Sequence, residues 1–208
     1  MLLTACGALA DGNSYLEPCS GRVVTVDHVA GAVTGTRPAD ASELAPPDVE
    51  PFRVALQGAL QSYCSDIYAP HGTLAVYGRE GSAAAGSMDV TVCLSSAKAN
   101  LRNFWSGRLG SCWQACFTPG TGDITLSGLM EVDVHYCEDG NVQLRAKHNA
   151  STSTQAHDAV SFGSAVAGAI QRAEAQYYAA LEVCIVNSVC SIRQTLRHVC
   201  ARVTHLHA

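Results

Sequence analysis

The sequence predicts an α+β fold: an antiparallel β-sheet covered on one face by a long C-terminal α-helix. Three observations lead to this prediction. A helical apolar pattern follows Pro51, alternating apolar and polar residues fill much of 73–147, and a longer helical pattern begins after the Ser/Thr run at 151–154. We expect one helical layer over one sheet face.

Residues 1–50 form the first expected region, of strand and loop. Arg22–Val29 is rich in β-branched residues and predicts a strand. Residues 31–51 contain glycine, proline and threonine without a sustained period, and we interpret them as a loop that ends at Pro46-Pro47. The second expected region, 51–204, holds the sheet and the long helix, and 205–208 are a residual tail.

A helix and a block of strands come next. Apolar residues recur at spacings of three and four from Phe52 to Ile67, which predicts a helix that His71-Gly72 stops. Strands are predicted at 73–77, 88–95, 103–117, 130–136 and 142–147, and the last two form a hairpin that turns at Asp-Gly. Across this hairpin we expect loose polar pairing of Asp133 and Glu131 with Arg145 and Lys147.

The second helix is unusually long. A residue of the run 151–154, or Asp158, could supply its N-cap oxygen, and the apolar rhythm runs from Phe162 to Val199. About 40 residues at about 1.5 Å each span roughly 60 Å. Since a compact domain needs less, we expect the helix to lie across a sheet that a partner subunit extends.

Composition limits the possible functions. The 208 residues are 48% apolar and 15% charged, enough apolar surface to exclude a disordered tail protein. A net charge of −5 argues against a general nucleic-acid binder, and no apolar run approaches the roughly 18–20 residues of a transmembrane segment. After Glu182 the chain carries three arginines and no acidic residue, which indicates an acidic partner or cations that complement a helix dipole.

No catalytic motif stands out. A phosphate loop, a nucleophile elbow and a dinucleotide fingerprint are all absent from the sequence, so we predict no enzyme and no cofactor. His135 near Asp133 and Glu138 could act as a general base, but a solvated strand face is the favoured interpretation. The ten cysteines follow no convincing secretory signal and form no tight Cys/His cluster, so we expect reduced, inert thiols and no metal site.

Two sequence blocks resemble a known family. The first is Asn103-Phe104-Trp105-Ser106-Gly107-Arg108, followed by Ser111-x-Trp113; the second is Val134-His135-Tyr136-Cys137-Glu138-Asp139-Gly140-Asn141-Val142-Gln143-Leu144. Both are similar, in order and spacing, to the alpha subunit of the F-actin capping protein. Ser106 and Cys137 depart from the family pattern. The resemblance extends from about residue 1 to about residue 204.

The resemblance implies a heterodimer with a beta subunit, whose sheet continues that of the alpha subunit beneath two long antiparallel helices. Such a pair caps actin-filament barbed ends independently of calcium and blocks subunit exchange. In this family the heterodimer also caps the actin-related filament of dynactin. The resemblance further implies a cytoplasmic, cytoskeletal location. The family's N-terminal helical stalk and C-terminal tentacle would be absent or reduced here.

Site residues follow from the same resemblance. Arg193 and Arg197 match basic positions that contact actin, and Arg202 matches a later one if the alignment slips by one residue. Two alternatives remain open. One is a shortened partner that binds the beta subunit without capping, and the other is an unrecognised thiol or metal enzyme.

Overall fold

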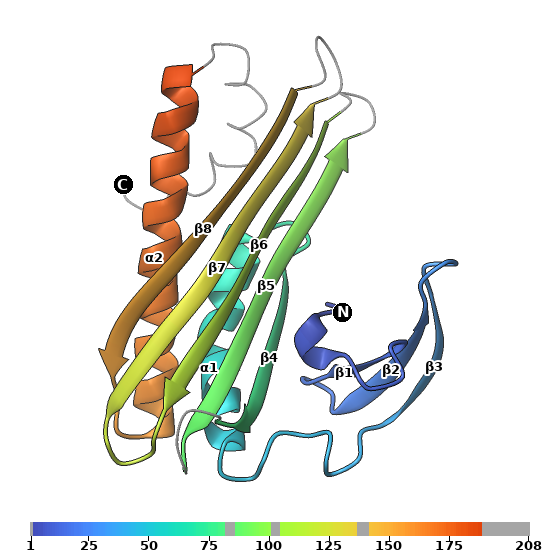
Figure 1. Cartoon of the computed structure of the whole chain (residues 1–208), viewed down its shortest axis with the longest axis vertical. Helices are drawn as coiled ribbons and strands as arrows, with labels where there is room; N and C mark the ends of the chain where they lie inside the picture. Colours follow the sequence, from blue (N-terminus) through green and yellow to red (C-terminus); the bar gives the residue numbers. More distant parts are fainter. Residues whose placement is uncertain (1, 82–85, 101–104, 137–141, 189–208) are drawn as a thin grey trace.

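The computed structural model describes residues 2–81, 86–100, 105–136 and 142–188. It contains a three-stranded antiparallel sheet of order β1-β2-β3, a five-stranded antiparallel sheet of order β4-β5-β6-β7-β8, and two α-helices (Figure 1). The predicted α+β class with an antiparallel sheet is therefore confirmed.

The small sheet lies near the N-terminus. A 3₁₀ turn, η1 (Ala5–Gly7), precedes β1 (Ser14–Glu17), β2 (Arg22–Asp27) and β3 (Ala32–Pro38). The predicted strand at 22–29 is confirmed, but the predicted loop at 31–51 is wrong over β3. Gly31, with φ of 62°, turns the chain back onto β2. Nearly every residue of β3 is exposed, so this edge strand has no alternating pattern by which it could be recognised.

The first helix, α1 (Glu50–Ile67), is confirmed. Pro51 suits its first turn, where a missing backbone N–H costs nothing. Leu56, Leu60 and Cys64 lie one turn apart and are buried in the main core. The helix ends at Tyr68, whose backbone N–H donates to the Cys64 carbonyl.

The five-stranded sheet is a meander in which each strand pairs with the next. Its strands are β4 (Thr73–Glu80), β5 (Met88–Asn100), β6 (Trp105–Phe117), β7 (Asp123–Tyr136) and β8 (Val142–Gln155). Four of them are longer than predicted: β4 and β5 continue to Glu80 and Asn100, β7 begins at Asp123, and β8 continues to Gln155. Serine and threonine fill the added part of β8, as in the pairs Ser127↔Ser151 and Thr125↔Ser153, so hydrophobic alternation is weak there. The added part of β7 does alternate, with Ile124 and Leu126 buried. The predicted Asp-Gly turn lies outside the described residues.

The second helix, α2 (Ala159–Ser188), begins at Asp158. The Asp158 Oδ1 atom accepts hydrogen bonds from the backbone N–H groups of Val160 and Ser161, each at 2.9 Å. Of the N-cap residues considered, Asp158 is the one used. The predicted continuation of the helix to Val199 lies outside the described residues from 189 onward.

Both helices lie on one face of the five-stranded sheet (Figure 1). The residues buried there come from α1, α2 and alternate sheet positions, among them Trp113, Leu126, Met130, Phe162 and Ile170. The opposite face carries a smaller cluster of Ala75, Tyr77 and Cys93, against which the N-terminal segment packs. Neither described helix has the length and apolarity that a bilayer-crossing segment needs.

Candidate functional site

The two resemblance blocks lie on neighbouring strands. Trp105 is paired with Tyr136, Gly107 with Val134 and Arg108 with Asp133, in continuous register between β6 and β7. The blocks therefore build one end of the sheet together. Five of the predicted motif residues lie outside the described part of the chain: Asn103, Phe104, Asp139, Gly140 and Asn141.

The outward face at this end of the sheet is polar. Arg108, Asp133 and Arg145 stand in line across β6, β7 and β8, and Asp133 Oδ2 lies 3.1 Å from Arg145 Nε. Glu131 and Lys147 form the next ion pair, so the expected cross-strand pairing is confirmed. Both pairs are largely exposed, and such pairs contribute only about 0–1 kcal/mol. His135 lies in register between Ser106 and Gln143 on the same shallow, polar surface, which is suited to contact with a partner.

The two tryptophans differ in their surroundings. Trp105 is half-buried, with the Lys98 ammonium 5.9 Å from its ring centroid. Trp113 is 1% exposed and lies opposite Gly128, where an added Cβ would come within 2.2 Å of the indole ring. Gly128 therefore makes room for Trp113 within the sheet.

A buried carboxylate joins α2 to α1 and to the sheet. Glu174 is fully buried, and its Oε1 accepts hydrogen bonds from Ser111 Oγ at 2.5 Å and from Trp113 Nε1 at 2.9 Å. Its Oε2 accepts from Tyr63 Oη at 2.6 Å and from Tyr68 Oη at 2.9 Å. The four donors match the acceptor capacity of one carboxylate. They fix the middle of α2 to α1 with its C-cap Tyr68 and to β6 at once.

The two tyrosines are held in the donor form. Burial, with the Glu174 charge as the next cause, raises the pKa of Tyr63 and that of Tyr68 well above the ordinary value. Sequence reasoning gave Glu174 no role. The available signal was a single acidic residue on the apolar stripe of a helix, between Ile170 and Tyr178.

The outer edge of β8 is a further candidate surface. β8 has 14 residues and is a terminal strand of its sheet, and within the described ranges nothing pairs with its outer side. A groove between β8 and α2 runs beside it, with Tyr177 stacked on His148 at a centroid distance of 5.3 Å. Among the described residues, the buried Tyr177 hydroxyl finds no hydrogen-bond partner. Within the described residues, this edge therefore presents unpaired backbone to a partner.

The three predicted actin-binding residues, Arg193, Arg197 and Arg202, lie outside the described residues. Three of the cysteines that we expect to be inert lie close together in the structure. Cys6, Cys93 and Cys112 bring their sulfur atoms within 4.8 Å of one another, and Cys112 is exposed. Since these cysteines come from three separate segments, their spacing in the sequence could not reveal the cluster.

Comparisons with known proteins agree with this fold. The sequence profile of the F-actin capping protein alpha subunit matches residues 1–193. The F-actin-capping protein subunit alpha of Dictyostelium discoideum is 38% identical over 181 residues, which cover 87% of this chain and 62% of that protein. The Arabidopsis thaliana protein of the same name is 33% identical over 174 residues, covering 82% of this chain and 56% of that protein. This chain thus spans about three fifths of the length of these relatives.

One solved structure has the same fold. The homodimeric actin capping protein alpha subunit from Plasmodium berghei superposes with a TM-score of 0.73 at 23% identity, covering 90% of this chain and 69% of that chain. Because the family profile covers most of the sequence, this chain belongs to the F-actin capping protein alpha subunit family.

Proposed function

We propose that this chain acts as the alpha subunit of a heterodimeric F-actin capping protein in the cytoplasm and cytoskeleton. The heterodimer would bind actin-filament barbed ends, independently of calcium, and block subunit exchange. The profile match over residues 1–193 is the observation that carries this proposal. Capping is binding without a chemical step. The surface that binds the actin barbed end would also bind the end of the dynactin filament.

The beta subunit would bind along β8. A partner strand paired with β8 would accept and donate the hydrogen bonds that the outer edge leaves open, and it would continue the sheet. The adjacent groove offers Tyr177, His148 and the exposed small residue Ala180. A partner helix could therefore approach α2 closely at this point.

Actin would meet the C-terminal end of the chain. Arg193, Arg197 and Arg202 give the segment after Glu182 a charge of +3, whereas the whole chain carries −5. A cationic end accelerates association with an acidic surface, and salt weakens that effect. We propose Arg193 and Arg197 as the principal actin contacts.

Partner binding is tested by co-expression with a capping protein beta subunit, followed by size-exclusion chromatography. We expect one beta subunit per chain. Ala180→Arg, which places a long cation in the groove, should reduce complex formation at least about tenfold, since charge without a partner is costly in an interface. The matched control is Ala175→Arg, exposed on the same helix but outside the groove. A chain that stays monomeric would refute the proposal.

Capping is tested by barbed-end elongation of actin from filament seeds, with calcium present or chelated. The wild-type complex should slow elongation equally in both conditions, and Arg193→Glu with Arg197→Glu should weaken capping. A heterodimer that leaves elongation unchanged would identify the chain as a dimerisation partner without capping activity. A stable homodimer, the state named for the Plasmodium structure, would refute the need for a beta subunit.

A further inference from the structure

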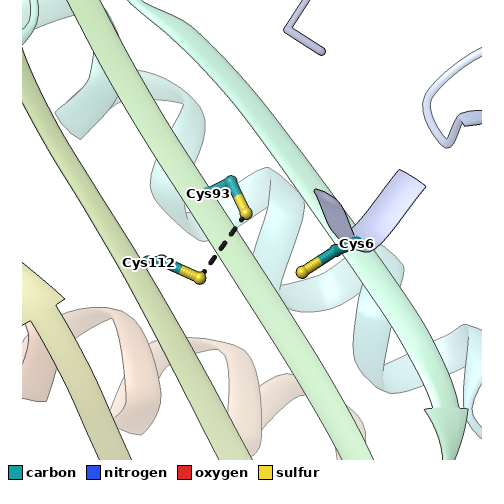
Figure 2. Close-up of side chains that lie close together, drawn as sticks. All are labelled: Cys6, Cys93 and Cys112. Atoms are coloured by element: carbon teal, nitrogen blue, oxygen red, sulfur yellow. Dashed lines mark hydrogen bonds between the residues drawn. The ribbon is translucent and has the colours of Figure 1, made fainter. Parts of the chain in front are cut away.

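Three thiols meet on the sheet face opposite the helices. Cys93 on β5 and Cys112 on β6 are direct cross-strand partners, and their sulfur atoms lie 3.8 Å apart. Cys6, on η1, approaches from the N-terminal segment, and all three sulfur atoms lie within 4.8 Å of one another. Figure 2 shows the three side chains directed toward one common point.

The position of Cys6 is fixed by contacts with β4. Thr4 Oγ1 caps η1 by accepting from the Gly7 N–H at 3.1 Å, and it also donates to Tyr77 Oη at 2.9 Å. A Cβ on Gly7 would lie 2.6 Å from the Tyr77 hydroxyl, so only glycine permits this approach. The Arg79 guanidinium donates to the Cys6 carbonyl. The third thiol is therefore held over the other two before any ligand binds.

The geometry suits a single ion. Thiolate bonds of about 2.3 Å to zinc place sulfur atoms about 3.8 Å apart in a tetrahedral site and about 4.0 Å apart in a trigonal one. The distance between Cys93 and Cys112 already lies in this range. The cluster contains sulfur ligands only, which select soft ions over magnesium or calcium. Cys112 is exposed, so an ion can reach the site from solvent.

Cysteine binds such an ion as the thiolate, so the protons of the three thiols matter. Hydrogen bonding from Cys112 and Cys93, aided by the Arg79 charge, lowers the pKa of Cys6 to about 3. Hydrogen bonding within the cluster and burial raise the pKa of Cys93. An ion that binds all three sulfur atoms would displace the protons that the thiols still carry.

We propose that Cys6, Cys93 and Cys112 form a binding site for one thiophilic d¹⁰ ion, copper(I) or zinc. Copper(I) would be held by the three thiolates alone, whereas zinc would add a water as its fourth ligand. The ion would fasten η1 to β5 and β6. It would therefore hold the N-terminal segment against the outer face of the five-stranded sheet, and it would stabilise the folded chain by mass action.

The test uses the full chain, reduced with a phosphine and titrated anaerobically with copper(I) or with zinc against a chromophoric competitor. We expect one tightly bound ion per chain. Cys6→Ser and Cys112→Ser should each weaken binding at least about 100-fold, because even outer-shell changes weaken metal sites by roughly 10–100-fold. The matched control is Cys116→Ser, on the same strand four residues from Cys112 but outside the cluster. Its affinity should equal that of the wild type.

A second readout keeps the test independent of folding. Without metal, far-ultraviolet circular dichroism and melting temperature should be similar for all three variants, and added ion should raise the melting temperature of the wild type and of Cys116→Ser only. Whichever ion reaches one equivalent at the lower free concentration is assigned to the site. Equal affinity in all variants would overturn the proposal. So would a reduced chain that binds neither ion and instead forms a Cys93–Cys112 disulfide in air.

Discussion

Replacing Glu174 with alanine removes an acceptor that four donors share in the core of the protein. Tyr68 and Ser111 would keep the hydrogen bond to each other, since their hydroxyl oxygens lie 3.1 Å apart. Tyr63 and Trp113 would lose the acceptor that each now has. The substitution therefore leaves one buried and one partly buried donor, Trp113 and Tyr63, without their present partner and opens a space where the carboxylate stood.

The expected loss follows from these two donors. A buried donor left without an acceptor costs about 1–3 kcal/mol, so two cost roughly 2–6 kcal/mol. Removal of a buried charge offsets part of this cost, and breaking one side of a buried charged network typically costs about 3–5 kcal/mol. We expect Glu174→Ala to lower the free energy of unfolding by about 3–5 kcal/mol. At about 2–4 °C per kcal/mol, the melting temperature should fall by roughly 10 °C.

The assay is urea denaturation followed by tryptophan fluorescence, with protein concentration and any partner held constant. Glu174→Gln keeps the side-chain volume and one acceptor oxygen, so its free energy of unfolding should lie between those of the wild type and Glu174→Ala. Gln176→Ala, exposed on the same helix, should lie within about 0.5 kcal/mol of the wild type. A loss below about 1 kcal/mol in Glu174→Ala would refute the role assigned to this network.

Three further predictions concern stability. Gly128→Ala should cost about 1–3 kcal/mol in denaturation experiments, because its Cβ would lie 2.2 Å from an indole ring. Gly110→Ala should be nearly neutral, because its Cβ would lie 3.7 Å from the Leu94 carbonyl oxygen. Because their pKa values are raised, Tyr63 and Tyr68 stay protonated in the folded state, so the stability that they contribute should be lost as pH rises above about 10. In an alkaline titration, the free energy of unfolding of Tyr63→Phe should therefore fall less steeply than that of the wild type. Asp158→Ala should cost about 1 kcal/mol through the lost N-cap, and a thermal melt in which it matches the wild type would contradict this.

Local patterns in the sequence predicted the elements whose two sides differ in polarity. α1 was found because its buried side chains recur at helical spacing, and the β7–β8 pairing was found because apolar and polar residues alternate around an Asp-Gly turn. The same reasoning missed β3, whose two faces are both exposed, and the Ser/Thr-rich part of β8. An element without such a contrast leaves no periodic signal.

The tertiary clusters could not be predicted for a different reason. Glu174 receives donors from residues 61–111 positions away in the sequence, and the thiol cluster unites positions 6, 93 and 112. Each of these residues looks ordinary within its own segment of the sequence. Only strand register, which aligns Cys93 with Cys112, and helix docking, which brings Glu174 over Trp113, assemble these groups.

The two faces of the five-stranded sheet therefore hold different parts of the chain. On the helix face, Glu174 holds α2 at mid-length against α1 and β6, so the described part of this helix is firmly fixed in the fold. A binding surface on a fixed element loses less conformational entropy when it meets a partner. The opposite face carries the N-terminal segment at the thiol cluster and an exposed polar ladder beyond it. Disrupting the network around Glu174 should therefore weaken partner binding by residues that Glu174 does not touch, whereas disrupting the thiol cluster should loosen the N-terminal segment and leave α2 in place.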